Sequence, residues 1–291
     1  MKDVNLPYYV PSKSYWPILG SIGLTTTMLG AASWLHEKSY GFYLFMLGSL
    51  IMAFMLFGWF RDVIIESRQN LYSPQMDRSF RWGMAWFIFS EVMFFAAFFG
   101  ALYYARCLSV PWLGGQGDKS IAHTLWPNFK AVWPLLISPD SNAFVKIKHV
   151  INPWGLPILN TGLLLSSGVT LTLAHHALQK NKRLILNLFL LLTIILGLIF
   201  MTCQVMEYQE AYSEEMQLTL KSGIYGTTFF MLTGFHGAHV CIGTLMMIIL
   251  CGRCFKGHFT PEKHFAFEAV AWYWHFVDIV WLILFVFVYW I

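Results

Sequence analysis

The sequence predicts an all-α membrane protein that crosses the bilayer seven times. Hydrophobic residues make up 57% of its 291 residues and charged residues only 12%, about half their usual share in a soluble domain. Seven apolar stretches each reach or exceed the roughly 20 residues that a helix needs to cross the hydrocarbon core. The stretches are continuous, whereas barrel strands would alternate every second residue, so they indicate helices.

The expected helices are listed here in chain order. They span residues 16–35, 40–60, 82–105, 155–178, 184–208, 224–250 and 265–291. The first is expected to be retained, because its apolar core is longer than that of a typical signal peptide. A loop over residues 106–154, rich in Pro, Gly and Trp, separates three helices from four, and its tryptophans suit the membrane interface.

The positions of Lys and Arg predict a cytoplasmic N-terminus. With seven spans, twelve of these residues, beginning with Lys2 and Lys13, fall on the N-terminal face and seven on the other, and the positive face is the cytoplasmic one. The net charge of +4 is therefore a topology signal. We expect no nucleic-acid partner, because no basic patch is interleaved with exposed aromatic residues.

Small residues recur at helical spacing in two of the expected helices. They are Gly162, Ser166, Thr170 and Ala174 in the fourth helix, and Gly234, Gly237 and Gly243 in the sixth. Such ridges let a neighbouring backbone come close. We therefore expect a tightly packed helix bundle.

Ionisable side chains at membrane depth cost roughly 2.5 to 3.5 kcal/mol each, so each needs a partner or a function. The candidates are Glu91, Glu207, His236, His239, Glu268, His275 and Asp278. The spacing within the last two helices, three or seven residues, places the polar residues of each helix on one stripe. This stripe is expected to face the interior of the bundle.

The residues alone leave three interpretations of these side chains open. His236 or His239 could ligate a haem together with His275. The histidines, Glu91 and Asp278 could relay protons in a transporter, or the groups could simply hydrogen-bond one another and fix the helix register. A dimetal carboxylate site is not expected, because it needs Glu-x-x-His pairs that the sequence lacks.

One further set has the spacing of zinc ligands. Cys251, Cys254, His258 and His264 form a Cys-x2-Cys pair followed by a His-x5-His pair. Against zinc, the cysteines overlap the end of the sixth helix and the intervening loop is short. The sequence has no phosphate loop, nucleophilic triad order or helical His-Glu-x-x-His, so we expect no catalytic residue in this chain.

Five segments resemble subunit III of cytochrome c oxidase. They are WFRDVIIES (59–67), FIFSEVMFFAAFFGALYY (87–104), LNTGLLLSSGVTLTLAHHAL (159–178), GTTFFMLTGFHGAHVCIGT (226–244) and HFAFEAVAWYWHFVDIVWL (264–282). The resemblance extends through all seven helices. It implies a core subunit of the respiratory enzyme that passes electrons from cytochrome c to oxygen and pumps protons.

The resemblance also implies an architecture and partners. Helices 1 and 2, in residues 1–81, would form one bundle, and helices 3 to 7, in residues 82–291 with the outer loop 106–154, a second. A V-shaped cleft between the bundles would hold phospholipids. Haem and copper would lie in subunits I and II, with subunit I the main contact, and this chain would carry no cofactor of its own. It would support proton uptake, protect the complex from inactivation and leave a route for oxygen.

Individual residues acquire roles by the same resemblance. Glu91 matches a buried carboxyl of the family, which we expect to be protonated or hydrogen-bonded by His236 or His239, because burial disfavours the charged form. The lipid-binding residues would be Trp59, Arg61, Glu66 and Arg253, the last binding phosphate through its planar fork of donors. Ile65, Tyr72, Tyr104 and Lys263 depart from the animal pattern, so no head group is assigned.

Two other functions remain as alternatives. Ubiquinol oxidases have a related subunit III, usually of five helices, and the two additional N-terminal helices favour the cytochrome c branch. A free-standing proton-coupled transporter is the second alternative. The long outer loop and the departures from animal sequences favour a bacterial inner (plasma) membrane over the mitochondrial inner membrane.

Overall fold

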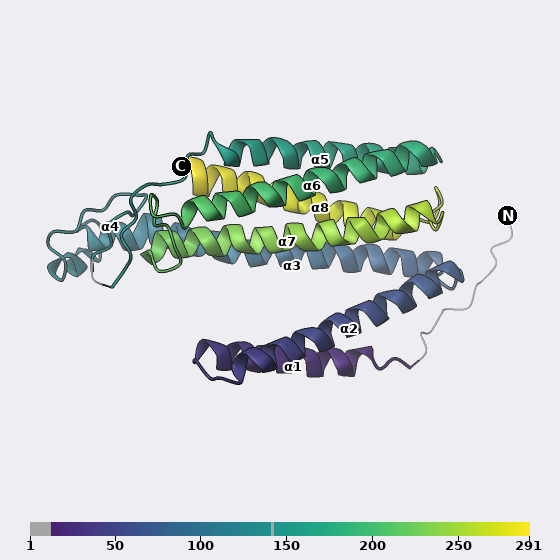
Figure 1. Ribbon diagram of the computed structural model, residues 1–291, viewed down its shortest axis with the longest axis horizontal. Helices are drawn as coiled ribbons and strands as arrows, with labels where there is room; N and C mark the ends of the chain where they lie inside the picture. Colours follow the sequence, from purple (N-terminus) through teal and green to yellow (C-terminus); the bar gives the residue numbers. More distant parts are fainter. Residues whose placement is uncertain (1–12, 141–142) are drawn as a thin grey trace. The chain divides into compact units, whose positions relative to one another are not determined.

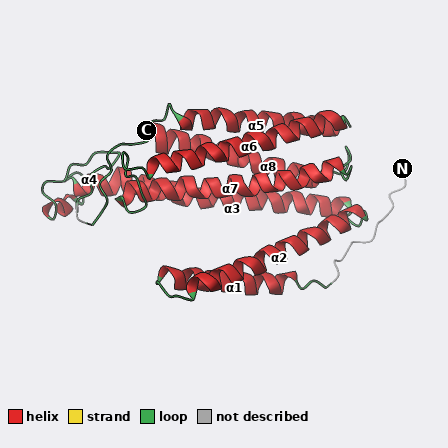
Figure 2. Cartoon of the chain, viewed as in Figure 1, coloured by secondary structure: helices red, strands yellow, loops and turns green. Residues whose placement is uncertain are grey.

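The computed structural model describes residues 13–140 and 143–291; residues 1–12, which include Lys2 of the topology prediction, and 141–142 lie outside the described residues. All regular structure in the described part is helical (Figure 2). Seven of its helices are long and apolar enough to cross a membrane. The predicted all-α fold with seven spans is therefore confirmed.

The membrane-spanning helices appear in Figure 1 under the labels used from here on. They are α1 (Trp16–Leu35), α2 (Gly41–Arg68), α3 (Pro74–Tyr104), α5 (Leu156–Gln179), α6 (Arg183–Ala211), α7 (Gly223–Phe255) and α8 (Phe265–Leu284). A π-helical segment, η3 (Phe285–Trp290), extends α8. The outer loop contains π-helical η1 (Ala105–Ser109), α4 (Val110–Leu113) and the 3₁₀ turn η2 (Ser120–Thr124).

Two helices are longer than hydropathy predicts. α2 continues eight residues beyond the expected end, to Arg68, and α3 begins at Pro74, eight residues before the expected start. These extensions contain charged residues such as Asp62 and Arg78. A hydropathy criterion stops at such residues, but a helix can continue through them into the polar interface because Arg and Glu are good helix formers.

Backbone contacts divide the chain into two compact units, Met1–Phe80 and Arg81–Ile291. The division falls inside α3, so that most of this helix belongs to the second unit. Each unit is described separately. The lipid-holding cleft between two bundles stays a prediction.

In the first unit, α1 and α2 form a hairpin whose contact is lined by glycine. Gly23 and Gly30 are buried on α1, and Gly41 and Gly48 on α2, so each pair is seven residues apart and lies on one face. A Cβ atom at Gly30 would meet the backbone of Phe45. Only glycine therefore lets the two backbones come this close.

A hydrogen bond links the start of α1 to the C-terminal part of α2. The indole N–H of Trp16 donates to Oδ2 of Asp62 over 2.8 Å. Its ring lies against Gly58, where a Cβ atom would overlap the indole. The position of the Trp16 ring therefore depends on two residues of α2. Gly58 leaves room for the ring, and Asp62, one turn later, accepts the indole hydrogen bond.

In the second unit, four helices pack in a closed ring. α5 contacts α6, α6 contacts α7, α7 contacts α8, and α8 contacts α5 (Figure 1). α3 packs on α7 and α8 through phenylalanine side chains: the ring centroids of Phe94 and Phe235 are 5.0 Å apart, and those of Phe95 and Phe276 6.1 Å. Edge-on aromatic contacts of this kind add to the packing energy of the apolar area.

Trp274 of α8 lies fully buried at the centre of this ring. Its indole N–H donates to the Ser167 hydroxyl of α5 over 2.8 Å. The ring lies beside Gly197 of α6 and Gly243 of α7, where added Cβ atoms would approach it to 3.1 and 2.8 Å. Small residues on three helices therefore make room for one large side chain.

The small-residue ridge predicted on α5 is only half buried. Thr170 and Ala174 are buried, but Gly162 and Ser166 are exposed. The reason is geometric: a four-residue step overshoots the 3.6-residue turn by about 40°, so the ridge winds away from the core. Thr170 bonds Thr193 of α6 over 2.7 Å, so its part of the ridge joins two helices.

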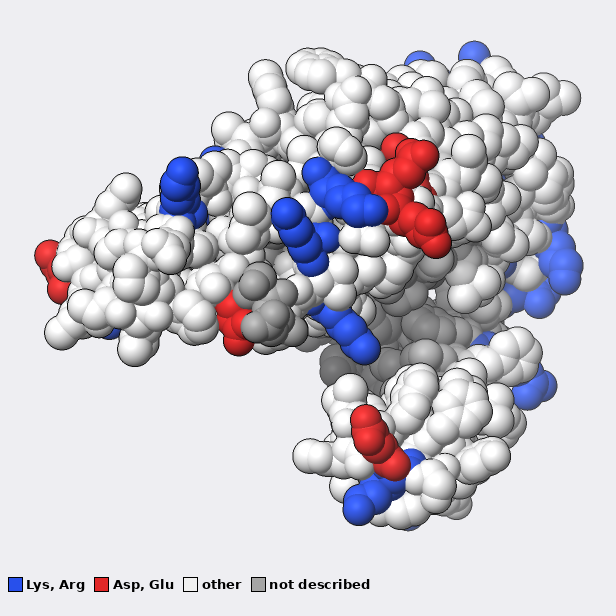
Figure 3. Space-filling model, turned by 60° about the vertical axis from the view of Figure 1, so that its left-hand side comes forward, with Lys and Arg blue, Asp and Glu red and all other residues white. Residues whose placement is uncertain are grey.

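The outer faces of the helices are apolar. Leu50, Val169 and Leu184 are 67%, 61% and 79% exposed, and most of the surface visible in Figure 3 carries no charged side chain. Contiguous apolar surface of this extent suits lipid rather than water. The structure therefore agrees with the membrane assignment from composition.

Substituting Gly243 tests the packing of Trp274. Gly243→Ala places a Cβ atom 2.8 Å from the indole ring, and overpacking of this kind costs about 1–3 kcal/mol. We expect a lower melting temperature of the detergent-solubilised protein. Gly237→Ala is the matched control on the same helix, because a Cβ atom there meets nothing within 4 Å; equal melting temperatures for the two variants would contradict the packing described.

Candidate functional site

A mostly buried polar contact joins α3 to α7. Nε2 of His239 lies 2.9 Å from Oε2 of Glu91, and both side chains are mostly buried. Nδ1 of His239 lies 2.6 Å from the carbonyl oxygen of Phe235. Of the two histidines that the sequence offers as partners of Glu91, the structure selects His239.

These contacts limit the protonation of the pair. The Phe235 carbonyl can only accept, so Nδ1 of His239 carries a hydrogen. A single proton then lies between Nε2 and the carboxyl group of Glu91. The pair is either a neutral acid with a neutral imidazole or a carboxylate with an imidazolium, and in both cases it has no net charge.

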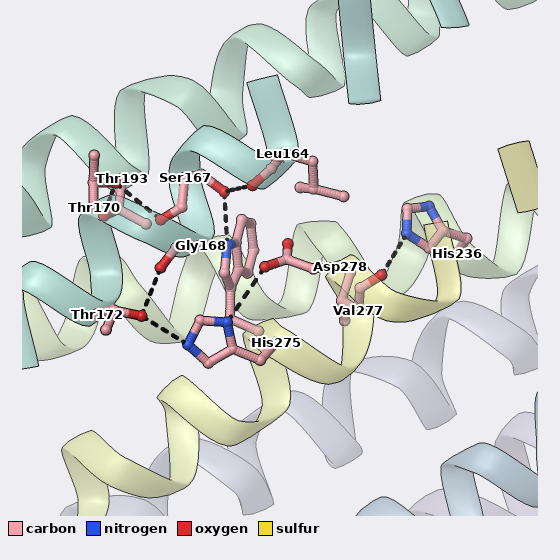
Figure 4. A network of polar contacts seen from close by, with 11 residues as sticks. Leu164, Ser167, Gly168, Thr170, Thr172, Thr193, His236, His275, Val277 and Asp278 are labelled. Carbon is pink, nitrogen blue, oxygen red and sulfur yellow. Dashed lines mark hydrogen bonds and ion pairs between the residues drawn. The ribbon is translucent and has the colours of Figure 1, made fainter. Parts of the chain in front are cut away.

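A second pair of an acid and an imidazole lies between α5 and α8 (Figure 4). Nδ1 of His275 is 3.5 Å from Oδ2 of Asp278, and Nε2 is 3.3 Å from the Thr172 hydroxyl. That hydroxyl donates to the carbonyl of Gly168 over 3.0 Å, so it accepts a hydrogen from Nε2. One proton again remains for the pair, which is neutral as a whole.

His236 lies in the apolar core. Its side chain is buried, and Nε2 donates to the carbonyl oxygen of Val277 over 3.2 Å (Figure 4). The Trp281 and Phe200 rings lie 5.1 and 5.8 Å from the imidazole. His236 therefore fixes the register of α7 against α8.

Glu268 occupies the first turn of α8. It forms an ion pair with Arg81 of α3. Its other oxygen, Oε1, lies 3.4 Å from Nε2 of His264 and 3.9 Å from Nε2 of His175. In the described part of the chain, His175, His264 and Glu268 are the side chains that lie close enough together to hold a metal ion.

The structure does not gather the zinc-like set read from the sequence. Cys251 and Cys254 are buried free thiols. No group of three from the set Cys251, Cys254, His258 and His264 comes within ligand distance among the described residues. His264 lies instead with His175, a residue that the sequence analysis did not single out.

The residues expected to bind lipid lie in both units. In the first, Trp59 is about half exposed and stacks on Phe60, Arg61 is exposed, and Glu66 accepts a 2.8 Å hydrogen bond from the Tyr72 hydroxyl. Tyr72 is one of the residues that depart from the animal pattern, and its hydroxyl is hydrogen-bonded to the carboxylate of Glu66.

In the second unit, the Arg253 guanidinium lies over the Phe259 ring, 4.4 Å from its centroid. Arg183 donates to the carbonyl of the same phenylalanine over 2.6 Å. Both cations therefore contact Phe259, in the segment that follows the C-terminal end of α7.

The sequence does not indicate the hydrogen-bond partner of the buried acid Glu207. Glu207 of α6 accepts a 2.5 Å hydrogen bond from the Tyr289 hydroxyl and a 3.2 Å bond from the Gln204 amide. The sequence marks Glu207 as a polar residue in a span, but no local pattern connects it with a tyrosine 82 residues later. This contact ties η3 to α6.

Comparisons with known proteins agree with these observations. The chain matches the family described as cytochrome c oxidase subunit III over residues 6–291. It is 39% identical over 287 residues to cytochrome c oxidase subunit 3 of Drosophila melanogaster, which covers 98% of this chain and 97% of that protein. It is 42% identical over 284 residues to the subunit 3 of Homo sapiens, covering 97% of this chain and 96% of that protein. The similarity includes all seven membrane-spanning helices.

Chemical labelling tests the proton shared by Glu91 and His239. A hydrophobic carbodiimide attacks protonated carboxyl groups, so we expect it to label Glu91 in native membranes, as detected by peptide mass spectrometry. Glu91→Gln serves as the unlabelled control, since its amide can still donate to Nε2 of His239 and the protein should assemble. Absence of labelling at Glu91 would indicate a carboxylate paired with an imidazolium.

Proposed function

Because the chain belongs to the cytochrome c oxidase subunit III family, it is a multi-pass inner-membrane subunit of an oxidoreductase complex, and we propose that it is a subunit without a redox centre. In this role it stabilises subunit I, binds phospholipids and supports proton uptake and oxygen access. Haem and copper are held by subunits I and II, and cytochrome c docks on the complex. The chain thus takes part in aerobic electron transport and proton translocation without reacting itself.

The observation that supports this proposal is that the candidate haem ligands already form hydrogen bonds within the chain. His239 uses both nitrogens, on Glu91 and the Phe235 carbonyl, and His275 uses both, on Asp278 and Thr172. His236 donates from Nε2 to Val277, and its Nδ1 has no hydrogen-bond partner among the described residues, but the ring lies between aromatic side chains of the core. An axial haem ligand needs a free imidazole nitrogen, so the hydrogen bonds of His239 and His275 favour a structural role for these two residues.

The neutrality of the two pairs favours the same role. A charged relay through the bilayer requires groups that change their net charge. Each pair instead holds one proton between two fixed groups. Glu91 with His239 is therefore proposed as a buried polar contact that stabilises the bundle and is linked to proton uptake only through the complex.

Phospholipid binding is proposed for Trp59, Arg61, Glu66 and Arg253. An exposed indole and a guanidinium at the end of a helix suit the level of the head groups. The Arg253 guanidinium lies over the Phe259 ring, so its fork of donors is ordered before a phosphate arrives. This order reduces the entropy lost on binding.

The membrane is proposed to be the bacterial inner (plasma) membrane. The departures from the animal pattern at Ile65, Tyr72, Tyr104 and Lys263, together with the long outer loop, support this choice. The mitochondrial inner membrane is the alternative.

Co-purification tests the proposed subunit. We expect an affinity tag on this chain to recover haem-bearing and copper-bearing partners from solubilised membranes, with a haem spectrum in the eluate and this chain identified by mass. Oxidation of reduced cytochrome c by the eluate separates the proposal from a ubiquinol oxidase, which would oxidise only quinol. Recovery of the chain alone, able to carry ions across vesicles, would indicate a free-standing transporter.

Replacing Arg253 tests the lipid site. Charge-assisted hydrogen bonds contribute about 1.5–3 kcal/mol, so Arg253→Gln should weaken phospholipid retention by roughly ten-fold or more. Lipid mass spectrometry of the washed complex gives the bound amount. Lys256→Gln, an exposed cation three residues later, is the control for nonspecific attraction; equal retention in both variants would argue against a role for Arg253.

A further inference from the structure

We propose that His175, His264 and Glu268 form a binding site for a divalent transition metal of the Zn²⁺ class. His175 lies in the last turns of α5, His264 immediately precedes α8, and Glu268 is in the first turn of α8. The site is therefore built from the adjoining ends of two packed helices.

The distances between the ligand atoms approach those of a zinc centre. Zinc bonds of about 2.0–2.1 Å in tetrahedral geometry place ligand atoms roughly 3.3 Å apart. Oε1 of Glu268 is 3.4 Å from Nε2 of His264 and 3.9 Å from Nε2 of His175, and all three ligand atoms lie within 4.8 Å of one another. A small movement of the His175 side chain, whose Nε2 is 3.9 Å from Oε1, would bring the three ligand atoms to these distances.

His264 presents an unshared electron pair to this position. Its Nδ1 lies 3.1 Å from the Thr260 carbonyl oxygen, which can only accept, so Nδ1 carries the hydrogen. Nε2 is then the free nitrogen of the neutral ring. The side chain is only 10% exposed, and Nε2 makes no hydrogen bond to any described residue. A backbone carbonyl that fixes the tautomer of a histidine is the usual support of a metal ligand.

His175 is oriented in the same way. Its Nε2 lies 3.5 Å from the Gln179 amide nitrogen, which can only donate, so Nε2 presents its lone pair there as well. That contact is long and comes from a flexible side chain, which a metal ion can displace. The centroids of the His175 and His264 rings lie 5.3 Å apart, with 65° between the ring planes.

The Glu268 carboxylate keeps one oxygen for a metal ion. Arg81 pairs with its Oε2. Neutral imidazoles are the form that binds metal. Oε1 remains free to act as the third ligand while Arg81 holds Oε2.

The donor set selects the class of ion. Two imidazole nitrogens and one carboxylate oxygen form the set of catalytic zinc sites, with the fourth position open to water. Mg²⁺ and Ca²⁺ prefer oxygen ligands throughout. We therefore expect Zn²⁺ to bind in preference to Mg²⁺, and more weakly than at a site without the nearby Arg81.

Zinc titration of the intact complex tests the site. Equilibrium dialysis with Zn²⁺ alone, read by elemental mass spectrometry, should give one fewer bound ion per complex for His175→Gln and for His264→Gln than for the wild type. His176→Gln is the matched control, since His176 is the exposed neighbour on α5. Wild-type stoichiometry in both His175→Gln and His264→Gln would overturn the proposal, provided that their haem content shows normal assembly.

A measurement on the wild type keeps the proposal testable if a variant fails to assemble. Diethyl pyrocarbonate modifies neutral imidazoles, and its adducts are located by peptide mass spectrometry. We expect Zn²⁺ to protect His175 several-fold against modification while leaving His176 unprotected. Equal rates at His175 with and without Zn²⁺ would overturn the proposal.

Discussion

A hydrocarbon environment offers no hydrogen-bond partners, and this constraint explains how α8 is built. The Trp274 indole reaches Ser167, and the Trp281 indole reaches Thr161, over 2.8 and 2.9 Å. Both partners are on α5, 107 and 120 residues earlier in the chain. Each bond satisfies a buried donor that would otherwise cost about 1–3 kcal/mol. The polar atoms of α8 therefore determine which helix lies beside it and in which register.

The acids of the interior obey the same constraint in another form. An isolated carboxylate at this depth would lose its hydration without compensation. Placing an imidazole beside it, and fixing the other imidazole nitrogen on a carbonyl or a hydroxyl, leaves a pair without net charge. Two such pairs form independently: Glu91 with His239 joins α3 to α7, and Asp278 with His275 lies on α8. Stabilisation of the buried acids is therefore a sufficient reason for these histidines to lie in the bundle.

The sequence predicts the helices well because hydropathy is a local property, and it predicts their partners poorly because pairing is not. The glycines of α1 and α2 recur at seven-residue spacing, a local pattern that indicates a helix contact just as the four-residue ridge of α5 does. That ridge winds out of the core at Gly162 and Ser166. The bonds of Trp16 to Asp62 and of Tyr289 to Glu207 join residues 46 and 82 positions apart, and no periodicity reports such distances.

The C-terminal end of α7 shows why residue spacing alone misassigns a ligand set. α7 continues as a helix through Phe255, so Cys251 and Cys254 stay on its buried face. The chain then ends the helix with Gly257 at φ +67°, where the amides of residues 257 and 258 bond back to the last turn. The segment that follows carries His264 to the start of α8, beside the end of α5. A motif continuous in sequence is thereby divided between two helix ends, and His264 meets His175 because helix packing, rather than loop length, sets its neighbours.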